Sequence, residues 1–176
     1  MSVAAISLYV STTAIAPVPI ADPLAPASKG LVECYNPDEQ EKTCTMISAY
    51  HPLGKTNYMM SAEAVLDFPG LPNVTLEMSS PGTAANGKVC AVVKLAAFRN
   101  AKIRVDGRLL DPSQAAPITR ILAESMRGME GKKSCTSYRM LPDSVIGATT
   151  MVEGLSAALE QKVKWIGKDE GYTVAP

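Results

Sequence analysis

The four cysteines of the chain, Cys34, Cys44, Cys90 and Cys135, are the residues whose chemistry the sequence indicates most clearly. No two of them form the Cys-x-x-Cys pair of thiol redox catalysis, and their wide separations do not fit the short paired spacing of a structural zinc site. An even number of cysteines predicts disulfide bonds, which persist in oxidising compartments. Metal binding and catalytic thiols are the alternatives, and we expect neither a metal nor a cofactor.

Four cysteines allow three pairings, of which we favour Cys34 with Cys44 and Cys90 with Cys135. The first two flank a polar segment with a Pro-Asp turn signal, so two antiparallel strands would bring their sulfur atoms together across a hairpin. The second bridge would connect a strand before the helix predicted below with a strand after it.

Acid-base chemistry has weaker support, because His51 is the single histidine of the chain and precedes a proline that favours a turn or a strand end. No Gly-x-Ser-x-Gly motif is present, so serine acyl chemistry has no local signature. We therefore do not expect an enzyme. The alternative is a hydrolase of envelope material with a site assembled in space, in which His51 or an acidic pair such as Asp143 with Glu153 takes part.

Binding chemistry has two candidate sources. Trp165 alternates with lysines, which predicts a packed residue of the core or the sheet, although an exposed tryptophan beside charges is typical of a partner contact. We name Trp165 and His51 as candidate partner contacts. The nine methionines fit a carrier of small ligands, because methionine lines adaptable apolar pockets, although it more often fills a core.

Short strands and one amphipathic helix must position these residues. Asp111 can cap a helix, Pro112 suits its first position, and apolar residues recur at three-and-four spacing up to Met129, which predicts a helix over about residues 111–128. Alternating or apolar runs bounded by turn residues predict strands. The runs are 31–35, 44–50, 57–66, 74–78, 88–95, 102–106, 108–110, 135–140, 145–152 and 163–166. The fold class is therefore α+β, a mainly antiparallel sheet or small barrel stapled by disulfides.

The N-terminal residues indicate export. Residues 3–21 carry no charge, and Ala25-Pro26-Ala27 resembles a signal peptidase site, so we predict a signal peptide over residues 1–27 and a single domain over 28–176. An uncleaved anchor and a disordered tail are the alternatives, because the usual basic residues at the start are missing. We expect a periplasmic or secreted protein whose mature chain has no transmembrane helix.

The charges nearly balance, with 17 basic and 17 acidic residues, and they are scattered along the chain. A scattered pattern lacks the basic stripe that follows a phosphate backbone, so we expect no nucleic-acid partner. The export signal instead favours a protein or another component of the bacterial envelope as the partner.

Several short segments resemble small uncharacterised proteins that are exported by alphaproteobacteria. They are Cys-Tyr-Asn-Pro-Asp at 34–38, Lys-Thr-Cys at 42–44, Val-Lys-Trp at 163–165 and Gly-Tyr-Thr-Val-Ala-Pro at 171–176. This resemblance implies export and carries no activity with it. The expected function is an exported, disulfide-stabilised binding or accessory module of the envelope, with the hydrolase and the small-ligand carrier as alternatives.

Overall fold

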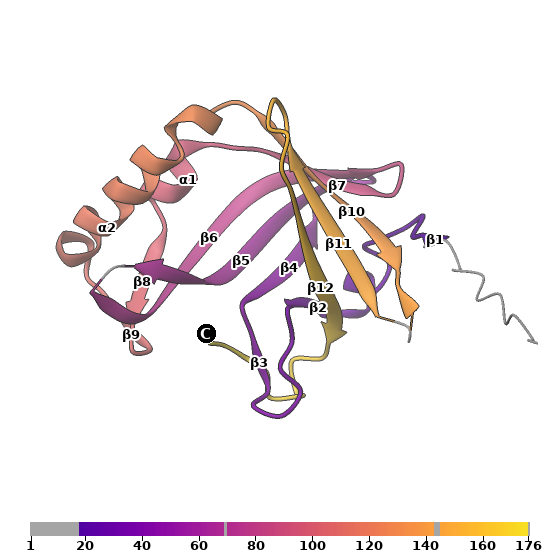
Figure 1. Cartoon of the computed structure of the whole chain (residues 1–176), viewed down its shortest axis with the longest axis horizontal. Helices are drawn as coiled ribbons and strands as arrows, with labels where there is room; N and C mark the ends of the chain where they lie inside the picture. The colour runs from indigo at the N-terminus through magenta and orange to yellow at the C-terminus, as the bar shows by residue number, and fades with distance from the viewer. Residues whose placement is uncertain (1–17, 69, 143–144, 176) are drawn as a thin grey trace, which may run out of the picture.

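A computed structural model of the chain describes residues 18–68, 70–142 and 145–175 (Figure 1). Residues 1–17 of the predicted leader and Asp143 lie outside the described residues. The strands of the described ranges are β1 (Val18–Pro19), β2 (Val32–Tyr35), β3 (Thr43–Cys44), β4 (Met46–Pro52), β5 (Asn57–Phe68), β6 (Leu71–Ala85), β7 (Lys88–Val92), β8 (Lys102–Val105), β9 (Arg108–Leu109), β10 (Lys133–Met140), β11 (Ile146–Val152), β12 (Ala158–Ile166) and β13 (Thr173–Val174). The helices are α1 (Leu95–Arg99) and α2 (Pro112–Ser125), with 3-10 turns η1 (Ala27–Lys29) and η2 (Arg127–Met129).

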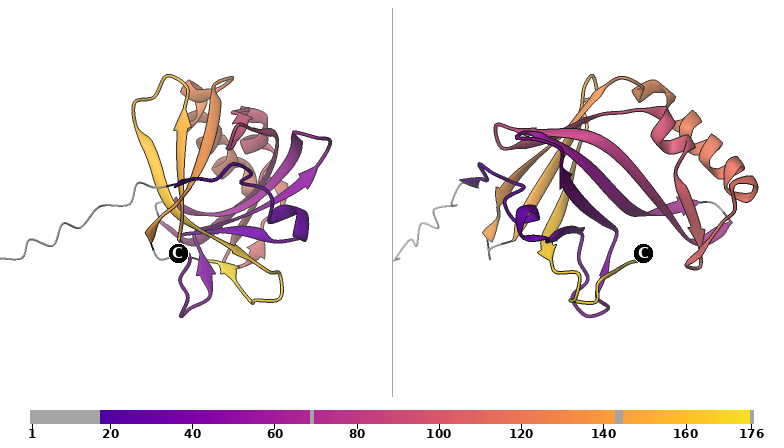
Figure 2. Two further views of the ribbon diagram at one scale, coloured as in Figure 1. Left: turned by 90° about the vertical axis from the view of Figure 1, so that its right-hand side faces the viewer. Right: turned by 180° about the vertical axis from the view of Figure 1, so that it is seen from behind.

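Eight of the described strands close into a barrel. In the order β10-β11-β12-β2-β4-β5-β6-β7 each strand pairs antiparallel with the next, and β7 pairs back with β10. Figure 1 shows β10, β11 and β12 crossing in front of β4, β5 and β6, and Figure 2 shows the same strands from the side and from behind. Closure leaves these eight strands without an unpaired edge along the ring. The predicted antiparallel barrel is confirmed, although β5 and β6 are longer than the short strands that were expected.

Successive side chains of β2 point alternately into the barrel and out of it, as the two-residue period of a strand requires. Tyr35 packs with Tyr138 of β10, Ala148 of β11 and Val163 of β12, so its side chain lies inside the ring. Glu33 lies on the same face of β2 as Tyr35. The other face of β2 carries Val32 and Cys34, which pack outside the barrel with Cys44 and Ile166.

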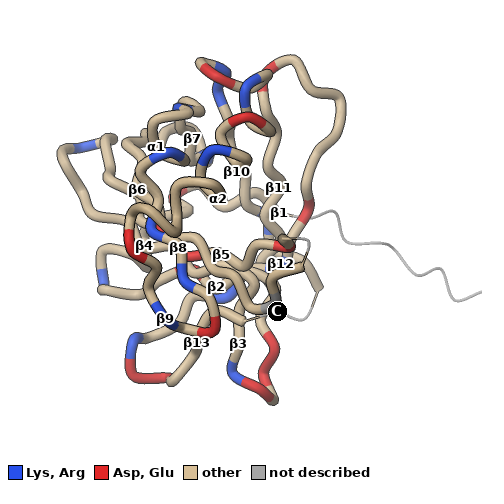
Figure 3. The backbone as a smooth tube through the Cα atoms, turned by 90° about the vertical axis from the view of Figure 1, so that its left-hand side faces the viewer, with Lys and Arg blue, Asp and Glu red and all other residues tan. Residues whose placement is uncertain are grey.

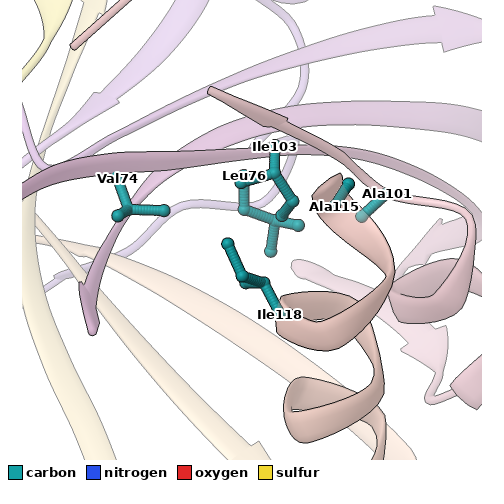
Figure 4. Close-up of a cluster of buried hydrophobic side chains, with 6 residues drawn as sticks. All are labelled: Val74, Leu76, Ala101, Ile103, Ala115 and Ile118. Atoms are coloured by element: carbon teal, nitrogen blue, oxygen red, sulfur yellow. The ribbon is translucent and has the colours of Figure 1, made fainter. Parts of the chain in front are cut away.

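Long β5 and β6 continue past the ring and carry a second core. There β6 pairs with β8, and α2 packs against both strands (Figure 4). Val74 and Leu76 of β6, Ile103 of β8, and Ala115 and Ile118 of α2 are all buried in this cluster. The helix thus covers the extension of the inner barrel face rather than a separate sheet.

The capping signals of the sequence place α2 correctly. Asp111 Oδ1 accepts hydrogen bonds from the backbone N–H groups of Ser113 and Gln114 at 2.9 and 3.0 Å, and the Gln114 side chain accepts one from Asp111 N–H. The helix ends at Ser125, before the predicted residue 128, because the chain tightens into η2 next to Gly128, a poor helix former. Helix α1 was not predicted, since five residues are too few to show a helical period.

The segment before β2 contacts the barrel. β1 pairs with Arg139 and Met140 at the edge of β10, and the Ile20 backbone N–H donates to the Tyr138 carbonyl at 3.0 Å. Leu24 is 3% exposed. Residues 18–27 of the predicted leader are therefore packed against the domain in this structure.

The C-terminal segment lies along the outside of the barrel. β13 pairs in parallel with β3, and the Ala175 backbone N–H donates to the Cys44 carbonyl at 3.1 Å. The Tyr172 hydroxyl contacts both Glu39 and Lys164, and hydrogen bonds from Lys164 and Tyr172 lower the pKa of the Glu39 carboxyl to about 2. Neither helix of the described residues is long and apolar enough to cross a membrane.

Candidate functional site

All four cysteines are joined in disulfides, Cys34 to Cys44 and Cys90 to Cys135, which is the pairing favoured from the sequence. The chain folds back between the two cysteines as expected, with an antiparallel bridge between Asp38 and Thr43 and antiparallel pairing of β2 with β4. Cys44 lies on β3, which pairs with β13, whereas β2 pairs with β4 and β12. The first bridge lies outside the barrel, and the second lies across β7 and β10.

The residues singled out for catalysis or partner contact lie apart from one another. His51 is exposed near the end of β4, where it pairs with Met59 of β5, and its side chain has no hydrogen bond or ion pair within the described ranges. Glu153 accepts a hydrogen bond from the Lys133 backbone N–H at 3.3 Å, and Asp143 lies outside the described residues. Trp165 is half-buried and shares the inner face of β12 with Val163, and its ring centroid lies 6.2 Å from that of Tyr50.

A buried glutamate inside the barrel is the titratable residue with the most unusual surroundings. The Glu33 carboxylate is fully buried, and its Oε2 accepts hydrogen bonds from Tyr50 at 2.6 Å and from Tyr35 at 2.8 Å. The Tyr35 and Tyr138 hydroxyl groups lie 3.4 Å apart and continue the network. Burial raises the pKa of the Glu33 carboxyl, and the hydrogen bonds from Tyr50 and Tyr35 act in the opposite direction.

Two polar atoms beside this network have no hydrogen-bond partner among the described residues. They are Glu33 Oε1 and the hydroxyl of Ser48, which is 1% exposed. Glu33 and Ser48 are direct partners in the pairing of β2 with β4, on the inner face. An unsatisfied buried polar atom costs free energy, so two of them side by side inside a barrel require an explanation.

Glu33 was not predicted as a site residue, although the sequence carries a signal for it. Glu33 is the single charged residue inside the otherwise apolar run 31–35, which predicts a strand. Its partners could not be inferred, because Tyr50 and Tyr138 reach Glu33 through strand pairing and barrel closure.

A cavity of about 230 Å³ lies between the inner face of the barrel and the helices. Met60 of β5, Met78 of β6, Met126 at the end of α2 and Met129 of η2 line it together with Phe98 of α1. Its remaining lining residues are Ser80, Ala91, Val92, Val93, Lys94, Ala97, Ser134 and Val152. Four of the nine methionines therefore meet at one apolar cavity.

Four larger hollows, of about 380 to 480 Å³, occur in the described part of the chain, and one of them adjoins the methionine cavity at Met78, Ser80, Lys94 and Ala97. Each has at least two charged residues in its lining, such as Glu77 with Lys102 or Lys162 with Lys164. The methionine cavity has a single charged residue, Lys94, in its lining. Ligand sites are concave and mostly apolar with few polar groups, so the smaller cavity has the chemistry of such a site.

The cavity and the buried glutamate belong to one inner surface. Glu33 pairs with Ser48, Ser48 with Ala62 and Ala62 with Met78, in a row that crosses β2, β4, β5 and β6. The next row joins Tyr50 to Met60. Directly paired residues of neighbouring strands have their side chains on the same face of the sheet. Both rows therefore lead from the glutamate cluster to methionines that line the cavity.

Metal binding has no matching geometry in the part of the chain that the structure describes. No three His, Cys, Asp or Glu side chains are grouped there as a metal would require. Figure 3 shows Lys and Arg interspersed with Asp and Glu around the molecule. No family model, curated protein or solved structure matches this chain.

Proposed function

We propose that this protein is an exported, disulfide-stabilised binding module of the bacterial envelope that holds a small apolar molecule between its barrel and its helices. The observation that carries the proposal is the meeting of Met60, Met78, Met126, Met129 and Phe98 at one cavity. These residues come from β5, β6, α1, η2 and the C-cap of α2, so their convergence depends on the tertiary fold rather than on one local segment.

The size of the cavity limits the ligand. A cavity of about 150 Å³ lined by apolar side chains is enough to bind benzene, whereas drug-sized ligands occupy roughly 300 Å³ or more. The 230 Å³ cavity lies between these sizes, which fits a substituted single ring or a short alkyl chain. Methionine side chains are unbranched and polarizable, so they can adapt to more than one such shape.

Export is supported by the two disulfides and by the sequence of the N-terminal residues. Disulfides persist in the periplasm and outside the cell, where glutathione and thioredoxin do not reduce them. A small apolar molecule in these compartments would come from the envelope or from the medium.

A homologous series of n-alkanols tests the proposal by isothermal titration calorimetry. Burial of one methylene contributes about 0.8 kcal/mol, so each added carbon should tighten binding roughly fourfold until the chain fills the cavity. Ala91→Leu narrows the cavity and should weaken binding, whereas Ala158→Leu at an exposed position of β12 is the matched control. No saturable binding by the folded wild-type protein would refute the proposal.

A further inference from the structure

The inner barrel surface that leads to the methionine cavity carries two buried polar groups without a hydrogen-bond partner among the described residues. Oε2 of Glu33 receives two phenol hydroxyl groups, while Oε1 has no donor among the described residues. The Ser48 hydroxyl, directly opposite on β4, also has no partner there. The two unpartnered groups, a carboxyl oxygen that accepts and a hydroxyl that can donate or accept, therefore lie at adjacent positions of the same face.

No Lys, Arg or His side chain of residues 18–68, 70–142 and 145–175 forms an ion pair with Glu33. The ion pairs of the described residues engage Glu39, Glu77, Glu124 and Glu160, and none includes Glu33. A buried carboxylate is costly unless a cation or several hydrogen bonds compensate it. Two phenol groups supply part of this compensation at Oε2, and Oε1 is left for a further donor.

Aromatic side chains surround this carboxylate. Tyr35, Tyr50 and Tyr138 belong to its hydrogen-bond network, and Trp165 is the direct partner of Glu33 in the pairing of β12 with β2. Half of the six tyrosines and the single tryptophan of the chain thus gather at one residue. The tyrosines present their hydroxyl groups to this network, and aromatic rings near a carboxyl group favour a cation such as an ammonium group.

We propose that the ligand of the barrel is an amphipathic primary amine, whose ammonium group binds Glu33 Oε1 and Ser48 Oγ while its apolar part occupies the methionine cavity. This inference rests on the proposed function, since the same cavity holds the apolar part. The Glu33–Ser48–Ala62–Met78 row connects the two regions, and Ala62 is the small residue between the polar and the apolar ends.

Isothermal titration calorimetry with three probes of equal chain length tests the polar contact. The probes are primary n-alkylamines of four to ten carbons, the matching alkanols and the matching alkanoates. Hydrogen bonds to a charged group are among the stronger ones, so the amine should bind at least about tenfold more tightly than the alcohol of the same length. The alkanoate should bind more weakly than the alcohol, because its charge would meet Glu33.

Two variants test whether Glu33 and Ser48 cause the preference for the amine over the alcohol. Glu33→Gln keeps the shape of the side chain and should bring the amine and the alcohol to similar affinities, and Ser48→Ala should reduce the preference for the amine. Glu41→Gln, at an exposed position, is the matched control and should leave the preference unchanged. The comparison of probes on the wild-type protein decides the question even if Glu33→Gln does not fold.

The outcomes separate the two proposals. Binding of alkanols without a preference for amines would overturn the amine inference and leave the apolar cavity intact. A preference for amines that persists in folded Glu33→Gln would also overturn it, because another group would then hold the ammonium. Failure of all three probes to bind the folded wild-type protein would refute the proposed function itself.

Discussion

Cys90 on β7 and Cys135 on β10 lie directly opposite one another, with their Cα atoms 4.1 Å apart. The pairing of β7 with β10 is the one that closes the ring of eight strands. The second disulfide therefore crosses the closing seam of the barrel, and it also links the two ends of the segment that contains β8, β9 and α2. The first disulfide, between Cys34 and Cys44, holds the β3 segment on the outside of the same barrel.

Removing the second disulfide should destabilise the protein more than removing the first. The chain-entropy account assigns about 4 kcal/mol to the bridge that spans 45 positions and about 3 kcal/mol to the bridge that spans 10. Urea unfolding of the double variants Cys90→Ser with Cys135→Ser and Cys34→Ser with Cys44→Ser measures both losses. Hydrogen exchange should increase along β7 and β10 in the first variant alone, and equal exchange in both variants would contradict the role of this bridge at the seam.

The packing of α2 on the extended strands gives a second prediction. Ile118 is 5% exposed, so Ile118→Ala should lower the free energy of unfolding by about 2 to 5 kcal/mol through lost burial and a residual cavity. Ile121 lies one turn away on the same helix and is 53% exposed, so Ile121→Ala should cost less than about 0.5 kcal/mol. Chemical denaturation of both variants makes the comparison, and similar losses would show that α2 does not pack as described.

Local signals in the sequence were enough to predict most elements of the fold. The alternation of Ile103 and Val105 and the Asp106-Gly107 turn predicted the β8–β9 hairpin, and both turn residues have the positive φ that such a turn requires. The closing pair of β7 with β10 could not be predicted in this way. It joins segments that are distant in the sequence, and strand periodicity does not specify which strands become neighbours.

The candidate site was harder to predict for the same reason. Glu33 and Ser48 looked like ordinary strand residues, and the methionines of the cavity are spread from Met60 to Met129. The number of methionines suggested an adaptable pocket, but its place depends on how α1, η2 and the end of α2 pack over the inner face of the barrel. Residue counts carry no information about such long-range placement.

The segment between residues 18 and 27 gives a third prediction. Leu24 is buried against the domain, so Leu24→Ala should lower the free energy of unfolding by about 2 to 5 kcal/mol. Leu53, at 63% exposed, is the matched control and should tolerate the same change within about 0.5 kcal/mol. A chain shortened to begin at residue 28 should also be less stable than one that begins at residue 18. Equal thermal midpoints for the two shortened chains would show that the segment does not contribute to the fold.

The buried carboxyl of Glu33 predicts a dependence of stability on pH. Burial raises its pKa above the ordinary value of 4.5, so the folded state keeps the proton at pH values where the unfolded state has lost it. Its contribution to the free energy of unfolding is therefore complete below about pH 4.5 and is lost as the pH rises through the folded pKa. Between the unfolded and the folded pKa of this carboxyl, the free energy of unfolding falls by up to about 1.4 kcal/mol per pH unit.

Urea unfolding of the wild-type protein and of Glu33→Gln between pH 4 and 9 measures this contribution. The variant lacks the carboxyl, so its stability relative to the wild type should increase with pH over this range. The control variant Glu41→Gln, at an exposed position, should show the same change of unfolding free energy with pH as the wild type. A constant difference between Glu33→Gln and the wild type would show that the carboxyl titrates alike in both states.

The methionine methyl groups offer the most direct test of the binding cavity. In a protein labelled with ¹³C at these methyls, a saturating n-alkanol should shift the NMR signals of Met60, Met78, Met126 and Met129, which line the cavity. The signals of Met140 and Met151, which are 37% and 54% exposed, should not move. This pattern is the result that the account predicts. Shifts confined to Met140 and Met151, or no saturable shift at any methyl, would contradict a ligand site between the barrel and its helices.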